Sequence, residues 1–158
     1  MKIYHLKQTQ VLPITLQQAW DFFSTPKNLE RITPDNMKFK VIYISGGEKT
    51  YAGQIIRYKL TLFPGVILNW MTEITHVNEP TMFVDEQRFG PYALWHHQHH
   101  FREVAGGVEM TDELNYAIPF GFLGRFANWI FVGREVNAIF EHRYKALERF
   151  FINDKNIK

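Results

Sequence analysis

Six short alternating segments, followed by one long amphipathic segment, restrict most strongly what this 158-residue chain can fold into. From residue 38 onward apolar residues recur at every second position, which is typical of half-buried β-strands. Short breaks rich in Gly, Pro and Asn separate these segments, so each strand is expected to pair antiparallel with the next. The predicted strands cover residues 38–44, 53–62, 67–77, 81–89, 93–104 and 108–117.

The remaining segments predict a further strand and three helices. Residues 2–11 alternate like a first strand, Thr15 and Gln18 form a capping box that begins a short helix, and Thr25 caps a second one. Between residues 122 and 151 apolar residues recur at steps of three and four, which predicts a helix on the order of 45 Å long. We therefore expect an α+β fold: a curved, antiparallel seven-stranded sheet wraps around a long C-terminal helix. Two short helices follow the first strand, and a cavity lies between the sheet and the long helix.

Three local strings resemble the START/polyketide-cyclase superfamily, whose helix-grip fold is shared with the birch-pollen allergen. They are Ala19-Trp20-x-Phe22-Phe23-Ser24-x-Pro26-x-Asn28-Leu29, then Gly90-Pro91-Tyr92 with Trp95-His96-His97-x-His99, and Met110-Thr111-Asp112-x-Leu114-x-Tyr116-x-Ile118-Pro119. Together they are similar to a bacterial ligand-binding subgroup, some of whose members are labelled cell-division inhibitors. The resemblance implies one helix-grip domain over residues 1–152, and the polar residues 153–158 are expected to fray as a C-terminal tail. The superfamily includes lipid carriers, hormone receptors and cyclases, so the fold alone does not name a function.

The composition narrows the class of protein. Basic and acidic residues nearly balance, to a formal net charge of +2, which argues against a nucleic-acid partner. Cysteine is absent, which excludes disulfides, thiol catalysis, cysteine-based zinc sites and the iron–sulfur cluster of the superfamily's ring-hydroxylating branch. No segment resembles a signal peptide or a bilayer-spanning helix, so we expect a cytoplasmic protein without stable membrane insertion. The oligomeric state stays open, a homodimer included.

The strand over residues 93–104 carries four histidines, and its alternation decides which of them face the interior. Trp95, His97, His99 and Phe101 share one face, which we expect to point inward because it holds both large rings. His96 and His100 fall on the opposite face. Hairpin geometry then predicts the cross-strand pairs His99–Asp112, Phe101–Met110, Asp85–His97, Gln87–Trp95, Trp70–Gln87 and Thr72–Asp85.

These registers predict a polar stripe inside an apolar cavity. Aromatic residues make up 16% of the chain, and so many rings in a small domain either fill a thick core or line a pocket for an apolar ligand. The polar stripe comprises Asp85, Gln87, His97, His99 and Asp112. The predicted ligand-binding wall around it comprises Trp70, Thr72, Phe83, Phe89, Trp95, Phe101, Leu114 and Tyr116 from the sheet, and Phe126, Trp129, Ile130 and Gly133 from the long helix.

The stripe supports three interpretations. In the first, it orients the polar end of a hydrophobic small molecule, such as a lipid or a polyketide-like compound, that the protein binds or transports. In the second, which the superfamily's cyclases imply, His97 or His99 acts with Asp85 or Asp112 as the acid/base pair of a cyclase or dehydratase. In the third, the polar groups satisfy only one another and water. We favour binding over catalysis.

Metal binding and protein partners are weaker hypotheses. Two histidines and two carboxylates could hold Zn²⁺. Histidine pairs on strands more often belong to polar networks, so we predict neither a metal nor another cofactor. A regulatory protein partner, which the inhibitor label of similar proteins implies, would require an exposed apolar patch on the helix or on the segment before it.

Two segments of the C-terminal part complete the sequence-based hypotheses. Residues Ile118 to Gly124 join the last strand to the long helix and form either an ordinary connection or a mobile apolar lip through which a ligand enters. Gly121 and Gly124 would permit the hinge motion of such a lip. Arg143 and the charged residues around it are expected on the solvated face of the helix.

Overall fold

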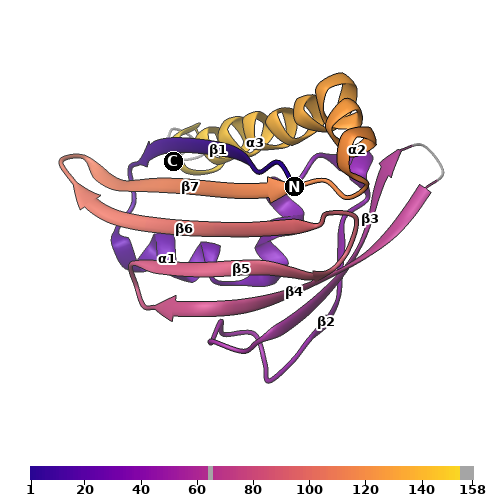
Figure 1. The fold of residues 1–158 in the computed structure, drawn as a ribbon. Coiled ribbons are helices and arrows are strands. Elements are labelled where there is room, and N and C mark those ends of the chain that lie inside the picture. Colours follow the sequence, from indigo (N-terminus) through magenta and orange to yellow (C-terminus); the bar gives the residue numbers. More distant parts are fainter. Residues whose placement is uncertain (64–65, 154–158) are drawn as a thin grey trace.

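The strands form one curved antiparallel sheet (Figure 1). The computed structural model of the chain describes residues 1–63 and 66–153. Within these residues the strand order is β1-β7-β6-β5-β4-β3-β2, so the first and last strands are neighbours and all other neighbours are consecutive in the chain. The strands are β1 (Tyr4–Leu12), β2 (Lys40–Ile44), β3 (Ile55–Phe63), β4 (Val66–Asn78), β5 (Met82–Phe89), β6 (Leu94–Val104) and β7 (Gly107–Ala117).

Short helices follow β1, and one long helix ends the chain. Thr15 caps the first helix as predicted: its side chain accepts a hydrogen bond from the Gln18 N–H, and the Gln18 side chain accepts one from the Thr15 N–H. The long helix runs without a break from Gly121 to Asn153 and includes two π-helical turns. The helices are α1 (Leu16–Phe23), η1 (Pro26–Ile32), η2 (Asp35–Met37), α2 (Gly121–Ala127), η3 (Asn128–Val132), α3 (Gly133–Glu148) and η4 (Arg149–Asn153).

This architecture confirms the predicted α+β helix-grip fold, with its seven strands, its two short helices after β1 and its long C-terminal helix. Residues 154–158 of the tail expected to fray, and residues 64–65 between the predicted strands 53–62 and 67–77, lie outside the described residues. No helix in the described part of the chain is long and apolar enough to cross a membrane.

The registers around β6 agree with the prediction. Asp85 pairs with His97 across β5 and β6, and His99 pairs with Asp112 across β6 and β7. The paired ladder of β5 and β6 ends at Glu86 and His96, so Gln87 and Trp95 lie beyond it.

The register of β4 and β5 differs from the prediction by two residues. Thr72 pairs with Gln87, and Ile74 pairs with Asp85. The predicted pairs imply a two-residue turn at Asn78 and Glu79, whereas the observed turn has three residues, 79–81, because Asn78 pairs with Met82. A bulge at Thr75, between Ile74 and His76, then adds one more residue to β4. The turn alone shifts the register by three residues and the bulge reverses one of them, so the net shift is even and Thr72 still faces the interior, where it is buried.

The interior contains two apolar clusters that meet along β6 and β7. The larger includes Phe101 and Met110, and the smaller includes Leu114 and Tyr116 with Phe140 of α3. Between them on each strand lie polar residues: His97 and His99 on β6, and Asp112 on β7. The sheet therefore places ionisable side chains at the boundary of two hydrophobic regions.

A candidate ligand cavity with a histidine–aspartate ring

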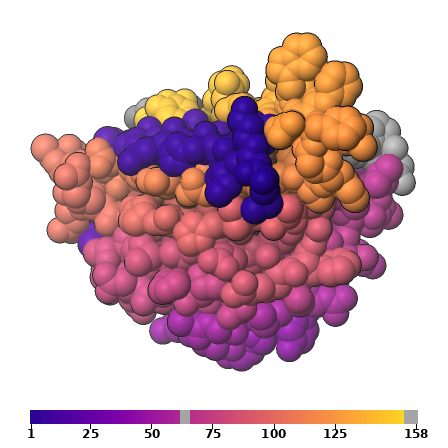
Figure 2. Space-filling model, viewed as in Figure 1, coloured from indigo at the N-terminus to yellow at the C-terminus, as the bar shows by residue number. Residues whose placement is uncertain are grey.

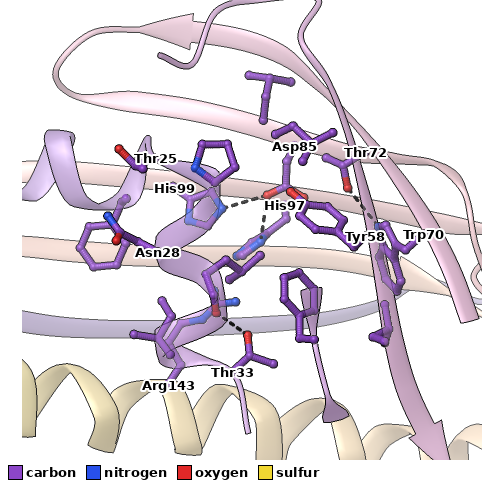
Figure 3. A pocket seen from close by; sticks show the side chains of 18 of the residues that line it. Thr25, Asn28, Thr33, Tyr58, Trp70, Thr72, Asp85, His97, His99 and Arg143 are labelled. Carbon is purple, nitrogen blue, oxygen red and sulfur yellow. Dashed lines mark hydrogen bonds and ion pairs between the residues drawn. The ribbon is translucent and has the colours of Figure 1, made fainter. Parts of the chain in front are cut away.

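A cavity of about 150 Å³, partly open to solvent, lies between the sheet, η1 and α3. Strands β3 to β6 supply one wall and η1 with its flanking residues supplies another, while α3 contributes Ile139 and Arg143 (Figure 3). The apolar part of the lining comprises Phe22, Phe23, Leu29, Ile32, Met37, Phe39, Ile56, Tyr58, Leu60, Trp70, Ile74, Phe83, Tyr92, Trp95 and Ile139. The space suits an apolar molecule.

Two imidazoles and two carboxylates close into a ring, which we call the histidine–aspartate ring: Asp85, His97, Asp112 and His99. Asp85 Oδ2 lies 3.2 Å from His97 Nδ1 and 2.9 Å from His99 Nε2. Asp112 Oδ1 lies 3.3 Å from His97 Nε2 and 2.8 Å from His99 Nδ1. Each imidazole therefore has a carboxylate at both of its nitrogens.

The ring has one side towards the cavity and one side away from it. Asp85, His97 and His99 line the cavity, and the Asp85 side chain keeps 17% of its surface exposed (Figure 3). Asp112 does not line it and is 2% exposed. A ligand could thus reach Asp85 and the neighbouring imidazole edges, whereas Asp112 supports the imidazoles from behind.

Packing fixes the orientation of both imidazoles. His99 stacks on Phe83, with the ring centroids 4.2 Å apart and the planes at 20°. His97 meets the edge of Phe140 from α3, with centroids 5.4 Å apart. Side chains held on strands and locked by aromatic neighbours keep their geometry better than side chains on loops.

Within the ring, each charged group favours the charged form of its neighbours and so opposes the effect of burial on their pKa values. Burial disfavours the charged form of Asp112, but His99 and His97 outweigh it and hold the pKa of its carboxyl well below the ordinary value. The same balance lowers the pKa of Asp85. For His97, burial lowers the pKa and the two carboxylates raise it, and the net shift is upward. Burial, together with the nearby Asp85 charge, raises the pKa of Tyr58 and keeps its hydroxyl protonated.

The ring is not fully hydrogen-bonded. His97 Nε2, His99 Nδ1 and Asp112 Oδ1 are close enough for ion pairs, but the angles on this side do not make hydrogen bonds within the described residues. Arg143 Nε is also buried without a hydrogen bond within these residues, and Arg143 Nη1 lies 3.7 Å from Asp112 Oδ2. Buried polar atoms in this state need an explanation, because most such atoms in proteins have a partner.

The predicted site residues fall into two groups in the sheet. Seven of them line the cavity: Trp70, Thr72, Phe83, Asp85, Trp95, His97 and His99. Phe101, Asp112, Leu114 and Tyr116 are buried but lie outside the cavity lining. Gln87 has another role, since its side chain donates to Tyr92 O and accepts from Tyr92 N across the β5–β6 turn. Gln87 therefore stabilises the β5–β6 turn and is not part of the polar stripe.

Phe89 lies outside the cavity, contrary to the prediction, and is 64% exposed. The register between β4 and β5 shifts at Arg88, so that Phe89 pairs with Met71 instead of continuing the pairing of Thr72 with Gln87. One extra residue in a strand turns the following side chain to the opposite face.

The first turns of the long helix also differ from the prediction. Phe126, Trp129 and Ile130 are exposed and do not line the cavity. Figure 2 shows the surface of α2 and η3 standing out from the rest of the molecule. Gly133 does not line the cavity either: a Cβ there would lie 3.1 Å from Asn128 O. Helical periodicity identified an apolar stripe, but its first turns, in α2 and η3, are largely exposed, whereas α3 and η4 pack on the interior clusters.

The connection before the helix contains one tightly packed glycine. A Cβ at Gly124 would lie 2.0 Å from Pro119 O, so close packing excludes a side chain there. Gly121 has φ +57°, a left-handed conformation that favours glycine, and Phe120 before it is 80% exposed. Whether the segment from Ile118 to Gly124 acts as a lip stays a prediction.

Arg143 is the main site residue that the sequence reasoning misplaced. It is 9% exposed and lines the cavity instead of the solvated helix face. The signal was present, because Val136, Phe140, Arg143 and Leu147 follow one another at steps of three and four and all are buried. Tyr58 and the residues of η1 were missed as well, since the prediction placed no wall on that side.

Comparisons with known proteins identify the fold. No protein-family model and no curated protein matches this sequence. Protein CV1439 from Chromobacterium violaceum superposes with a TM-score of 0.72 at 11% identity, covering 93% of this chain and 96% of that chain. Ginseng major latex-like protein 151 from Panax ginseng gives 0.68 at 13% identity, over 95% of this chain and 98% of that one. Zhui aromatase/cyclase from Streptomyces sp. R1128 gives 0.68 at 12% identity, over 94% and 95%.

Proposed function

The chain has the helix-grip fold of the START/polyketide-cyclase superfamily, and from that premise we propose that the protein binds a small hydrophobic molecule in the cavity. The observation that carries the proposal is the lining: an aromatic wall that is interrupted on one side by Asp85, His97 and His99. The wall takes the apolar body of the ligand, and the polar edge fixes its orientation.

The size of the cavity favours a ring-shaped ligand over a long chain. About 150 Å³ is comparable to an apolar cavity that accommodates a benzene-sized molecule. Because the cavity is partly open, the rest of a larger ligand can extend through the mouth. A polyketide-like or other aromatic compound therefore fits better than a long-chain lipid held entirely inside.

The polar groups favour a ligand that carries an oxygen acceptor. Arg143 lines the cavity from α3, and its Nε has no hydrogen-bond partner among the described residues. A guanidinium group can donate to a carbonyl, enolate or phenolate oxygen. Both nitrogens of His97 face carboxylates, so the ring presents the Asp85 carboxylate to a ligand rather than an imidazole N–H.

The first experiment asks what the purified protein carries. Native mass spectrometry, followed by solvent extraction, is expected to detect a small aromatic or polyketide-like molecule in the protein isolated under native conditions. If repeated preparations from the original host carry no such molecule and the protein also fails the probe titration below, the binding proposal is wrong.

The second experiment uses the fluorescent probe 1-anilinonaphthalene-8-sulfonate, which combines apolar rings with an anionic group. We expect saturable binding that Ile139→Trp abolishes, because the larger side chain fills the cavity from α3. The matched control is Phe122→Ser on the exposed part of α2, which removes an apolar surface residue outside the cavity and should leave the titration unchanged. If Phe122→Ser abolishes binding and Ile139→Trp leaves it unchanged, the probe binds to the exposed helix, which would contradict the proposal.

A cyclase- or dehydratase-type activity is the second candidate, and one observation favours it. His97 and Asp85 lie together at the cavity wall, with His97 Nδ1 3.2 Å from Asp85 Oδ2, so a proton could pass between the pair and a substrate at Asp85, the member of the ring that keeps some exposed surface. With the extracted compound as substrate, His97→Gln separates the two functions. A binder loses affinity modestly, whereas an enzyme loses turnover by orders of magnitude while still binding.

A further inference from the structure

We propose that the cavity side of the histidine–aspartate ring is a site for a divalent transition-metal ion, with Asp85, His97 and His99 as its ligands. One atom from each of the three side chains lies within 4.8 Å of the others. The ion would occupy the position where Asp85 Oδ2, His97 Nδ1 and His99 Nε2 converge, next to the cavity. Metal binding goes beyond the proposed function and does not depend on it.

The spacing of these three atoms suits a small ion. In a four-coordinate zinc site, bonds to nitrogen and oxygen place the ligand atoms roughly 3.3–3.5 Å apart. The 3.2 and 2.9 Å separations from Asp85 need only a small outward shift of that side chain, the least buried of the three, and the two imidazole nitrogens lie within 4.8 Å of each other. Two imidazoles and one carboxylate are a ligand set used by catalytic zinc and by non-haem iron, and the fourth position would open into the cavity.

Asp112 supplies a carboxylate to the ring nitrogens of His97 and His99 that face away from the proposed metal. Histidine ligands usually donate their second ring N–H to a carboxylate, which fixes the tautomer and the orientation of the imidazole. Asp112 Oδ1 faces His97 Nε2 at 3.3 Å and His99 Nδ1 at 2.8 Å. One buried carboxylate thus serves both imidazoles from behind, and these are the atoms that lack hydrogen bonds within the described residues.

The tautomers give an independent argument. Each imidazole lies between two carboxylates, so a neutral imidazole must direct a lone pair at one of them. A cation on the Asp85 side removes this conflict for both residues at once. His97 then binds it through Nδ1 and His99 through Nε2, and both remaining N–H groups point at Asp112.

The charge count indicates what a bound ion would accept as its fourth ligand. Asp85, Asp112, Arg143 and a divalent ion, with both imidazoles neutral, carry a net charge of +1. An anionic oxygen would neutralise the site. This part of the inference rests on the proposed function, because it makes the oxygen acceptor of the cavity ligand the group that contacts the metal.

The test titrates chelator-stripped protein with Zn²⁺ alone, by isothermal titration calorimetry, and with Co²⁺ by visible absorption. We expect one equivalent to bind and the Co²⁺ complex to show the visible bands of a four- or five-coordinate site. The matched control is the double variant His96→Gln, His100→Gln, which removes the two histidines on the outer face of β6. It should bind like the wild type.

Variants within the ring should weaken binding in order. His97→Gln and His99→Gln each remove a ligand and should abolish saturable binding in the control background. Asp85→Asn keeps the shape of a partly exposed side chain and should weaken binding at least tenfold. Asp112→Asn should weaken it about 10–100-fold by disturbing both imidazoles. Circular dichroism confirms that each variant is folded.

Two results would overturn the inference. One is the absence of saturable binding by folded wild-type protein at millimolar Zn²⁺. The other is binding that is lost in the outer-face control and retained in folded Asp85→Asn. Neither metal titration uses a cavity ligand. A failure to bind metal therefore leaves the probe titration of the proposed function unaffected, and a failure to bind the probe leaves the metal result unaffected.

Discussion

The two faces of β6 carry the same residue type in opposite environments. On the inner face, His97 and His99 are buried within a closed ring of two carboxylates. On the outer face, His96 contacts Glu86 at 2.8 Å and is linked through Gln98 to His100, and all of these side chains are partly exposed. The outer groups form an open chain whose members can exchange a protein partner for water.

The difference shows that burial, rather than histidine content, determines what these residues contribute. When a member of the outer chain is removed, water can replace it as the partner of its neighbour, so the free energy of unfolding changes little. Removing a member of the ring leaves a buried group without a partner, which is costly. The same side-chain chemistry therefore forms a costly buried network on only one side of the strand, which is also the side where we propose ligand and metal binding.

The largest expected effect comes from opening the ring at its buried side. Asp112→Ala leaves both imidazoles without their rear carboxylate and should lower the free energy of unfolding by about 3–5 kcal/mol. Urea denaturation followed by tryptophan fluorescence measures it. The control is Glu113→Ala, the next residue on β7, which faces outward and contacts Lys7 at 3.4 Å. A comparable loss in both variants would remove the contrast between the two faces.

A second variant tests whether the ring itself stabilises the fold. Replacing both aspartates of the ring by Val and both histidines by Leu removes the four ring members together and leaves Arg143 as the buried charge beside them. We expect this quadruple variant to be about 1–4 kcal/mol more stable than Asp112→Ala, because Arg143 loses Asp112 in both variants and no imidazole or carboxylate of the ring is left stranded. If thermal unfolding finds the quadruple variant less stable than the single one, the ring contributes net stability and our account of its cost is wrong.

A third, smaller effect concerns the stacking that holds His99. A double-mutant cycle of Phe83→Leu and His99→Gln should give a coupling of about 0.5–1.5 kcal/mol, the value typical of aromatic pairs. The corresponding cycle with Phe101→Leu, a buried residue on the same face of β6 with no ring contact to His99 among those described, should give a smaller coupling. Equal couplings would indicate general packing instead of a specific stack.

The smallest effect is expected on the outer face. Glu86→Gln removes the carboxylate that contacts His96 and Arg88 there, and should change the free energy of unfolding by only about 0–1 kcal/mol. Added salt should reduce even this difference, since exposed ion pairs are screened. A loss close to that of Asp112→Ala would mean that the outer chain is as strongly coupled as the ring.

Sequence reasoning reached the ring but not all of the cavity. The alternation of β6 and the short hairpins on either side were enough to pair Asp85 with His97 and His99 with Asp112. It failed where an extra residue enters a strand, since neither the bulge at Thr75 nor the shift at Arg88 has a Gly or Pro to mark it. The exposure of Phe89 follows directly from the second of these.

The long helix was harder to predict for a different reason. Periodicity tells which side of a helix is apolar but not whether a surface is available to cover that side. Trp129 belongs to the stripe and is 77% exposed, whereas Arg143 is charged and lies in the interior. Burial of Arg143 depends on the face of Phe140, one turn earlier in α3, and on Asp112, which only the tertiary structure brings next to it.

The pairing of β1 with β7 also has a consequence for how the chain is made. Tyr4 pairs with Tyr116, whereas every other strand pairs with the one that precedes or follows it. During synthesis the hairpins from β2 to β6 can form as they leave the ribosome, but β1 stays without its partner until β7 has emerged. Asp112 arrives with that same strand, so the nascent chain exposes an unpaired edge and an open ring until both close together. Closing such a long loop is slow compared with forming a hairpin, and this interval is when the nascent protein is most exposed to aggregation.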